Sequence, residues 1–450
     1  MPTGDFSLYA HWTGNPYKVH FDANGGSGTM VDQAFVYGTA QKLSANAFKN
    51  GMYAFAGWAM KPDGEVVYAD GQSVENLTAS ANGVVTLYAV WTMDRLLLYT
   101  EVTEAAPTAA ASTYDGYLYD AAGNVKGTIQ VKVGKPNAKT KLASVKAVVV
   151  GLDGKKKNLK AAEKGKAEIL ADGTTTIPLV GGDACEVKLG AHGMSGTYGD
   201  YEIDGGLNVF TSKDAADKAV ATAALNQWRG AVNVAWREDA TGRVPPYHTL
   251  TVMIAAKGKA KVAGTLADGA KVSATSQLVV GEDWCCVPVA YAKRGVNLAF
   301  NVWLPKVATG RDTPSVVGLG DAVVGKPGTL RAGAAFCLGA VLGDAKYADY
   351  LPDGMAVVQS GTKWTLPKAG KVQLAKDGTV DEAKLGGNPS ALKLTYKAAD
   401  GTFKGSFKAY ADVNGKPKAT TVNVTGVLVD GTGYGTAAVK KAAVAPVTIE

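Results

Sequence analysis

Cysteine and histidine are both scarce in this chain of 450 residues, which contains four of each. Structural zinc sites bring four such ligands together at short, regular spacings. Here the histidines are widely separated and form no HExxH motif, and the cysteines show no metal-binding spacing. The sequence therefore predicts neither a metal centre nor, with so few cysteines, a disulfide scaffold.

Long apolar runs are also lacking. No stretch reaches the roughly 18 apolar residues that a membrane-spanning helix needs. The first residues, Met1 to Asp5, lack the basic start and apolar core of a signal peptide. P-loop and Rossmann fingerprints are absent as well. We therefore expect no transmembrane segment and no cofactor.

Glycine, by contrast, is abundant, with 55 residues, whereas aromatic residues make up 8% and charged residues 19% of the chain. This balance suits short strands joined by glycine turns better than it suits a helical enzyme. A chain of this length can bury several cores, and its length predicts three or four domains. We predict a mainly β protein.

The most distinctive motif lies between residues 17 and 91. It consists of FDANGG at 21–26, YAFAGW at 53–58 and LYAVW at 87–91. The Asn-Gly-Gly of the first segment supplies the positive φ values of a tight turn. The last segment belongs to a run that alternates as half-buried strands do.

These three segments, in this order, resemble the Listeria–Bacteroides repeat, also called the internalin B-repeat. The resemblance implies a small β-grasp-like module over residues 14–93, of the kind found in tandem on bacterial surface proteins. It therefore implies an extracellular, cell-surface location. We expect the core of the module to contain Phe21, Phe55, Trp58, Leu87 and Trp91.

A second copy of part of this motif stands at the start of the chain. Residues 4–13 match residues 83–92 in order, and both end in Leu-Tyr-Ala-x-Trp-Thr. We interpret residues 1–13 as the last strand of a preceding repeat. We therefore expect the chain to be a C-terminal piece of a longer protein.

Residues 94–111 include an Ala/Pro/Thr-rich stretch with little capacity to bury surface, which indicates a linker. Beyond it, segments with period-two alternation recur, and we predict β modules at residues 112–245, 246–315 and 316–450. We expect antiparallel barrels or sandwiches. These modules resemble the C-terminal regions of large surface proteins of uncultured gut bacteria.

Three stretches of the modules repeat one pattern: a strand, a glycine turn, and a strand with a glycine inside it. Gly127, Gly264 and Gly405 occupy equivalent points in this pattern. A glycine inside a strand weakens the strand unless it forms a bulge or lets another strand cross closely. We predict that these three glycines allow the sheets to close into barrels.

One helix is expected, over residues 213–228, with Thr211 and Ser212 as its cap. We expect it to plug a barrel end or to link two subdomains. Its predicted apolar stripe consists of Ala216, Val220, Ala223 or Ala224, and Trp228.

The four cysteines allow three pairings. Cys285 and Cys286 are neighbours in an extended run, so their side chains should point to opposite faces. One of them could bridge to Cys185 or Cys337, as an exported protein would permit. A vicinal redox pair and buried free thiols are the alternatives.

Few residues suggest catalysis. His192, Ser195 and Asp200 gather in one segment, but no nucleophile elbow precedes a helix there, and a bulged strand explains the glycine-rich context. The acidic turns at 200–204 and 377–382 do not have the spacing of an EF-hand. A hydrolase would need a carboxylate pair from among Glu202, Asp204, Glu238 and Asp239.

Tryptophans are the stronger binding candidates, because aromatic faces stack on sugars and peptides. Those in the strand-rich part are Trp228, Trp236, Trp284, Trp303 and Trp364. A second candidate is the segment 112–168, with twelve lysines, five acidic residues and no arginine. A basic face attracts anionic glycans, membrane surfaces or nucleic acid, although a solvated lysine-rich sheet accounts for it as well. Without arginine we predict no specific nucleic-acid binding.

The sequence thus predicts a non-catalytic, monomeric, extracellular fragment of a bacterial surface protein. It would mediate adhesion by binding a polysaccharide or a host or neighbouring surface protein. One alternative is a structural stalk or C-terminal anchoring region of a larger secreted protein. The other is a carbohydrate-active hydrolase with a carboxylate pair in a barrel mouth.

Overall fold

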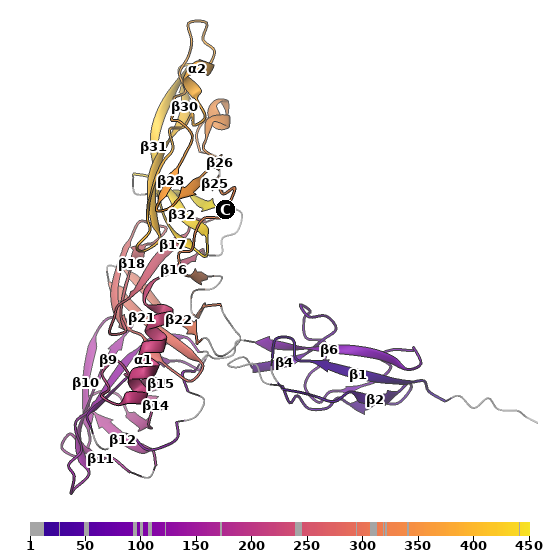
Figure 1. Ribbon diagram of the computed structural model, residues 1–450, viewed down its shortest axis with the longest axis vertical. Coiled ribbons are helices and arrows are strands. Elements are labelled where there is room, and N and C mark those ends of the chain that lie inside the picture. The colour runs from indigo at the N-terminus through magenta and orange to yellow at the C-terminus, as the bar shows by residue number, and fades with distance from the viewer. Residues whose placement is uncertain are drawn as a thin grey trace, which may run out of the picture. The chain divides into compact units, whose positions relative to one another are not determined.

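The computed structural model (Figure 1) confirms a mainly β protein with antiparallel sheets and a closed barrel. The chain divides into two compact units, residues 1–97 and 98–450. Within the described residues, no helix is long and apolar enough to cross a membrane. The structure describes residues 13–26, 28–48, 54–92, 97–99, 102–106, 110–121, 123–171, 173–238, 245–293, 295–306, 313–317, 319, 322–339, 342–440 and 442–450.

The first unit is built on a four-stranded sheet of order β2-β1-β6-β4. Its two central strands, β1 and β6, run parallel, and each pairs antiparallel with an edge strand. The bounds are β1 (Pro16–Asp22), β2 (Gln33–Val36), β4 (Ala54–Ala59) and β6 (Gly83–Thr92), with a separate small pair of β3 (Gln41–Lys42) and β5 (Ser73–Val74). Residues 1–12, most of the predicted preceding strand, lie outside the described residues.

Trp58 forms the centre of the first core and is fully buried. The rings of Phe21 and Phe55 lie 4.8 and 4.7 Å from its own, centroid to centroid. Leu87 is also fully buried, whereas Phe55 and Trp91 pack against the core with partial exposure. The first pair is tilted and the second is edge-to-face, and both arrangements add to the stability gained from burial. All five predicted core residues belong to this cluster or pack against it.

The second unit begins with a closed barrel. Its eight strands follow one another in the order β10-β12-β13-β14-β15-β7-β8-β9. The pairing of β9 with β10 joins the two ends of this order and closes the barrel. Apolar residues alternate inward, so a single core fills the barrel. Its strands are β7 (Ser112–Tyr119), β8 (Val125–Val133), β9 (Leu142–Gly151), β10 (Lys156–Ala161), β12 (Thr175–Val180), β13 (Cys185–Leu189), β14 (Gly193–Tyr198) and β15 (Tyr201–Leu207), with β11 (Lys166–Glu168) added beside β9.

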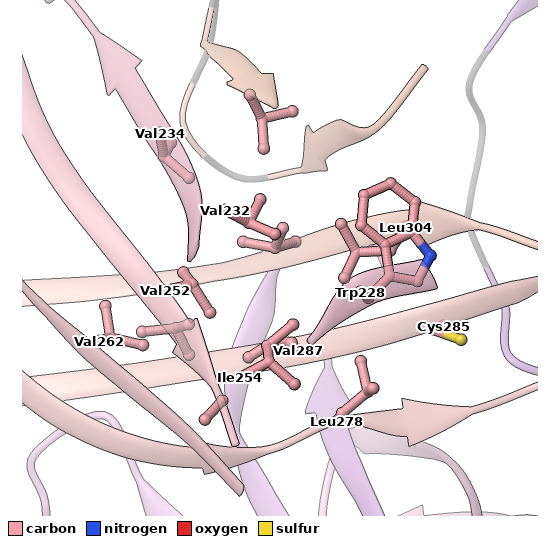
Figure 2. Close-up of a cluster of buried hydrophobic side chains, with 14 of the residues drawn as sticks. Trp228, Val232, Val234, Val252, Ile254, Val262, Leu278, Cys285, Val287 and Leu304 are labelled. Carbon is pink, nitrogen blue, oxygen red and sulfur yellow. The ribbon is translucent and has the colours of Figure 1, made fainter. Parts of the chain in front are cut away.

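Two sheets and a helix enclose the next core. The sheets have the orders β19-β18-β17-β16-β24 and β20-β21-β22-β23. Figure 2 shows side chains of both sheets meeting in this core, with Trp228 of the helix beside Leu304. The elements are α1 (Ala215–Trp228), β16 (Gly230–Trp236), β17 (His248–Ile254), β18 (Lys259–Thr265), β19 (Lys271–Gln277), β20 (Val279–Val280), β21 (Trp284–Lys293), β22 (Val296–Pro305), β23 (Ser315–Val317) and β24 (Val323–Gly325).

The last module is a seven-stranded sheet of order β26-β25-β33-β32-β31-β30-β29, accompanied by the hairpin β27–β28. It contains the longest strands of the described chain, β30 and β31. The elements are β25 (Ala335–Leu338), η2 (Ala345–Tyr350), β26 (Met355–Ala356), β27 (Val358–Ser360), β28 (Lys363–Thr365), α2 (Glu382–Leu385), β29 (Lys393–Lys397), β30 (Thr402–Val413), β31 (Lys416–Val429), β32 (Thr432–Val439) and β33 (Ala442–Ile449).

The extents of the hydrophobic cores do not coincide with the module boundaries predicted at 245/246 and 315/316. One core ends at Leu207 and the next runs from Val209 to Val324, followed by a third from Leu330. A boundary near 245 would separate β16 from β17, which pair along their whole length. Helix α1 belongs to the middle module rather than to the barrel, because its buried Ala221, Ala224 and Trp228 are part of the middle core.

The described part of the predicted linker 94–111 is packed into the second unit. Leu98, Val102 and Ala106 are buried. The backbone N–H of Leu98 donates to Asp204 Oδ2 at 2.7 Å, and its carbonyl accepts from the N–H of Glu282 at 2.9 Å. Leu98 thus connects the barrel with the middle module, a role that the Ala/Pro/Thr composition around it did not indicate.

Helix α1 begins two residues later than expected. Asp214, not Thr211 or Ser212, is the cap, and its carboxylate accepts from the N–H groups of Ala216 and Asp217. Ser212 instead donates its hydroxyl to Asp217 Oδ2 at 2.5 Å, which draws that carboxylate inward. The buried face is correspondingly shifted from the predicted stripe and consists of Asp217, Ala221, Ala224 and Trp228.

The three glycines predicted to close the sheets lie where neighbouring strands approach too closely for a side chain. A Cβ atom would lie 2.5 Å from the Val150 carbonyl oxygen at Gly127, and 2.0 Å from a strand carbonyl oxygen at Gly264 and at Gly405. Real Cβ contacts are longer than this, so only glycine fits. Gly127 lies in the closed barrel, as predicted. Gly264 and Gly405 lie in the five-stranded and seven-stranded sheets, whose described strands form no closing pair, so for these two residues the structure shows close strand approach and not barrel closure.

Candidate functional site

All five tryptophans proposed as binding residues are buried, with exposed fractions of 0 to 8%. Trp236 stacks on His248, and Trp284 packs edge-on against Trp303. Trp228 and Trp364 are core residues too. Their role in binding stays a prediction, and their burial argues against direct contact with a ligand.

The four cysteines are free thiols in the structure. Cys285 faces the core of the middle module, in which Figure 2 shows its sulfur, whereas Cys286 lies near Asp204 of the barrel. The two side chains therefore point to opposite faces, as expected. Burial raises the pKa of Cys185 to about 11 and that of Cys285 to about 12, which disfavours the reactive thiolate of a redox pair.

The carboxylates suggested for a hydrolase serve other contacts. Asp204 is buried and accepts from the N–H of Leu98, and Glu202 accepts from the Tyr119 hydroxyl at 3.0 Å. Glu238 lies 3.5 Å from His248, and Asp239 lies outside the described residues. His192 lies 3.4 Å from Asp217 rather than beside Ser195. In the described part of the chain, no group of three or more His, Cys, Asp or Glu residues could hold a metal ion.

The lysines of segment 112–168 stand on the outer face of the barrel. In β9 and β10 the exposed Lys146 and Lys160 alternate with buried Val145 and Leu159. A pocket of about 300 Å³ on this face is lined by Lys166 and by acidic residues as well. Mixed charge and full solvation fit the solvated-surface interpretation better than a built anion site.

A different surface has the features of a binding site. A groove of about 370 Å³ lies between the outer faces of β17–β18 in the middle module and β29–β31 in the last module. We call it the threonine groove. It is lined by Thr249, Thr251, Ala263, Gly264, Thr265, Thr395, Tyr396, Lys397, Thr402, Phe403, Lys404, Thr425, Gly426 and Val427.

Asn233 fixes the two sheets beside the groove. This side chain is fully buried, and its Nδ2 donates to the carbonyl oxygens of Asp400 and Leu428 at 3.0 and 2.9 Å. Its Oδ1 accepts from the Thr251 hydroxyl at 2.7 Å. A buried amide with its hydrogen bonds satisfied holds its neighbours in one arrangement, so the width of the groove is set by the fold.

The threonine hydroxyls of the groove are used in a consistent way. Thr251 donates to Asn233, Thr402 to Asp400 Oδ1 at 2.7 Å, and Thr395 to the Lys404 carbonyl oxygen at 3.2 Å. Because a hydroxyl has one hydrogen and two lone pairs, a threonine that donates to the protein can still accept from a ligand. The groove therefore presents hydroxyl acceptors beside two ammonium groups. That of Lys397 is ion-paired with Asp400, which leaves part of its donor capacity for a ligand.

A second pocket, of about 390 Å³, shares Tyr396 with the groove. Arg229 and Lys326 give it positive charge, and we call it the cationic pocket. Tyr396 stacks on Trp364, with ring centroids 4.7 Å apart and planes 3° apart. The Lys326 ammonium lies 5.2 Å from the centre of the Trp228 ring. Two of the predicted tryptophans, Trp364 and Trp228, therefore lie behind residues that line the cationic pocket.

Comparison with known proteins concerns the first unit. Residues 17–90 match the family model of the Listeria-Bacteroides repeat domain. The resemblance carried by the FDANGG, YAFAGW and LYAVW segments is thereby confirmed. No curated protein and no solved structure matches the chain.

The Listeria-Bacteroides repeat is a domain of surface or extracellular type. It occupies the first unit, whereas the threonine groove and the cationic pocket belong to residues 98–450. The repeat therefore indicates a location, and the chemistry must come from the second unit. Sequence reasoning missed Arg229, Lys326, Tyr396 and the threonines, since strands far apart in sequence bring them together.

Proposed function

We propose that this chain acts at the bacterial cell surface as a non-catalytic adhesion segment that binds a polysaccharide in the threonine groove. The location rests on the Listeria-Bacteroides repeat at residues 17–90. The observation that carries the binding role is the groove's lining, with six threonines, two lysines and, among the described residues, no carboxylate.

Sugar chains suit such a surface because each sugar carries several hydroxyls that donate and accept hydrogen bonds. The threonine oxygens accept from these hydroxyls, and Lys397 and Lys404 donate to ring and hydroxyl oxygens. Few side-chain atoms cover part of the floor of the groove, since Ala263 contributes one carbon and its neighbour Gly264 contributes none. A ligand can then approach the strand backbone closely.

Isothermal titration calorimetry of the chain against a panel of neutral and acidic polysaccharides tests this proposal. Lys404→Ala removes a charged donor and should weaken binding about tenfold, a loss of about 1.4 kcal/mol. Ala263→Trp fills the groove and should abolish binding. Lys408→Ala is the matched control, since Lys408 lies on the same strand, β30, outside the groove lining.

Binding that survives Ala263→Trp would contradict the groove as the site, and a panel without any binder would contradict polysaccharide recognition. The second outcome would favour the stalk alternative, which the Leu98 and Asn233 contacts between modules support. Release of new reducing ends from a bound polysaccharide would instead favour the hydrolase.

A further inference from the structure

The cationic pocket lies directly beside the threonine groove. The segment that joins β29 to β30 lines it through Ala398 and Ala399, while Lys397 and Thr402 on either side line the groove. Tyr396 lines both. A chain-like ligand that follows β29 therefore meets both sites in succession.

The two cations of the pocket have no acidic partner in the described part of the chain. Neither Arg229 nor Lys326 forms a salt bridge there, although both are exposed and line the same cavity. No carboxylate lines that cavity among the described residues. A concave site with charge of one sign concentrates ligands of the opposite charge.

The walls of the pocket are fixed by contacts behind them. The Trp364 indole N–H donates to Gln359 Oε1 at 3.1 Å, and the same oxygen accepts from the N–H of Leu330 at 3.0 Å. Trp364 also stacks on Tyr396. Gln359 and Tyr396, which both line the pocket, are therefore held in place before a ligand arrives.

We infer that the polysaccharide is acidic, and that a carboxylate or sulfate on one of its sugars binds Arg229 and Lys326 in the cationic pocket. This inference rests on the proposed function and adds the class of ligand. The guanidinium of Arg229 donates two parallel hydrogen bonds to such a group, and Lys326 adds a compact positive charge. The neighbouring sugars lie in the threonine groove.

Arg229 also has a structural role that the test must separate. It follows the last residue of α1, where a cation is favoured by the helix dipole. Arg229→Gln should therefore lower thermal stability slightly whatever the ligand is. Lys326 is not part of the helix end, so Lys326→Ala removes its ammonium group and the contact of that group with the Trp228 ring without touching the helix cap. Thermal unfolding of both variants therefore separates an effect on binding from an effect on folding.

The decisive experiment uses two pairs of probes that differ in charge alone. Polygalacturonate is compared with its methyl ester, and dextran sulfate with dextran, by calorimetry at low and physiological salt. We expect at least about tenfold tighter binding of the charged member of one pair, which also identifies carboxylate or sulfate as the group bound. Arg229→Gln combined with Lys326→Ala should abolish that difference, whereas Lys293→Ala, on the far sheet, should retain it.

The inference would be overturned if charged and neutral probes bound equally well and the double variant did not change their binding. If Ala263→Trp still abolished that binding, the threonine groove would remain a binding site. Loss of the preference in Lys293→Ala as well would show that only diffuse surface charge is responsible, which also overturns it. Absence of binding to any probe contradicts both proposals.

Discussion

The side-chain amide of Asn233 donates a hydrogen bond of 2.9 Å to the carbonyl oxygen of Leu428, 195 residues further along the chain. A second hydrogen of the same amide binds the Asp400 carbonyl oxygen, and its oxygen accepts from Thr251. One buried side chain thus satisfies three polar groups on the two sheets that flank the threonine groove.

Asn233→Leu should loosen the contact between the middle and last modules. The substitution keeps the size of the side chain but leaves two carbonyl oxygens and a hydroxyl without their partner, which costs about 2 to 4 kcal/mol. We expect faster hydrogen exchange of amides in β16 and β31, measured by mass spectrometry. Asn297→Leu, at an exposed position on β22, should leave exchange unchanged, and unchanged exchange in Asn233→Leu would show that the amide is dispensable.

Gly264→Ala should destabilise the middle module. The new methyl group would stand 2.0 Å from the Thr249 carbonyl oxygen and 2.8 Å from the Leu250 Cα, both in the paired strand β17. The strands must separate to admit it, at a cost of about 1 to 3 kcal/mol. Thermal unfolding followed by circular dichroism measures this loss. Gly173→Ala is the control, because nothing lies within 4 Å of a Cβ there, and an equal effect of both would contradict the role of close strand crossing.

The four thiols should differ sharply in reactivity. Cys337 is partly exposed, whereas Cys185, Cys285 and Cys286 are buried. Burial raises the pKa of all four thiols, so solvent access sets Cys337 apart. We expect one fast reaction per chain with an aromatic disulfide reagent at pH 8, followed by three slow ones that accelerate in denaturant. Cys337→Ser should remove the fast phase. A fast phase that persists in this variant would mean that a buried thiol is accessible.

Acid should destabilise the middle module through His248. Burial lowers the pKa of this imidazole below its ordinary value of 6.5, although Glu238 and Asp268 oppose the shift. The unfolded chain then binds the proton more tightly, so the stability present at neutral pH is lost as the pH falls through the unfolded pKa and below.

His248→Asn tests this pH dependence, because an asparagine oxygen can accept the hydrogen bond that Nδ1 now takes from the N–H of Ala267 at 3.1 Å. Urea unfolding between pH 7.5 and 5 should show a smaller loss of stability in the variant than in the original chain. Parallel curves for the two proteins would assign the pH dependence to other groups.

Much of the local structure follows from the sequence because it depends on near neighbours. The FDANGG turn and the LYAVW strand mark the repeat, and period-two alternation marks the strands of the barrel. Gly127, Gly264 and Gly405 were located by their place in a recurring pattern, and each lies where the backbone of a paired strand approaches closely. Helix α1 was expected within two residues of its observed start, but its buried face is decided by packing against the middle core, which contains Ala221, Ala224 and Trp228.

The sequence by itself determined the β class, the repeat whose family is of surface or extracellular type, and the glycines that let strands approach. Only the tertiary structure decided the module boundaries and the candidate site. Trp228 and Trp364 are binding candidates by residue type alone, yet both are buried beneath the site, because burial depends on which sheets meet. Arg229, Lys326 and Tyr396 come from segments up to 167 residues apart. No local sequence pattern indicates that the end of a helix, the residue after β24 and the strand β29 will lie beside one another.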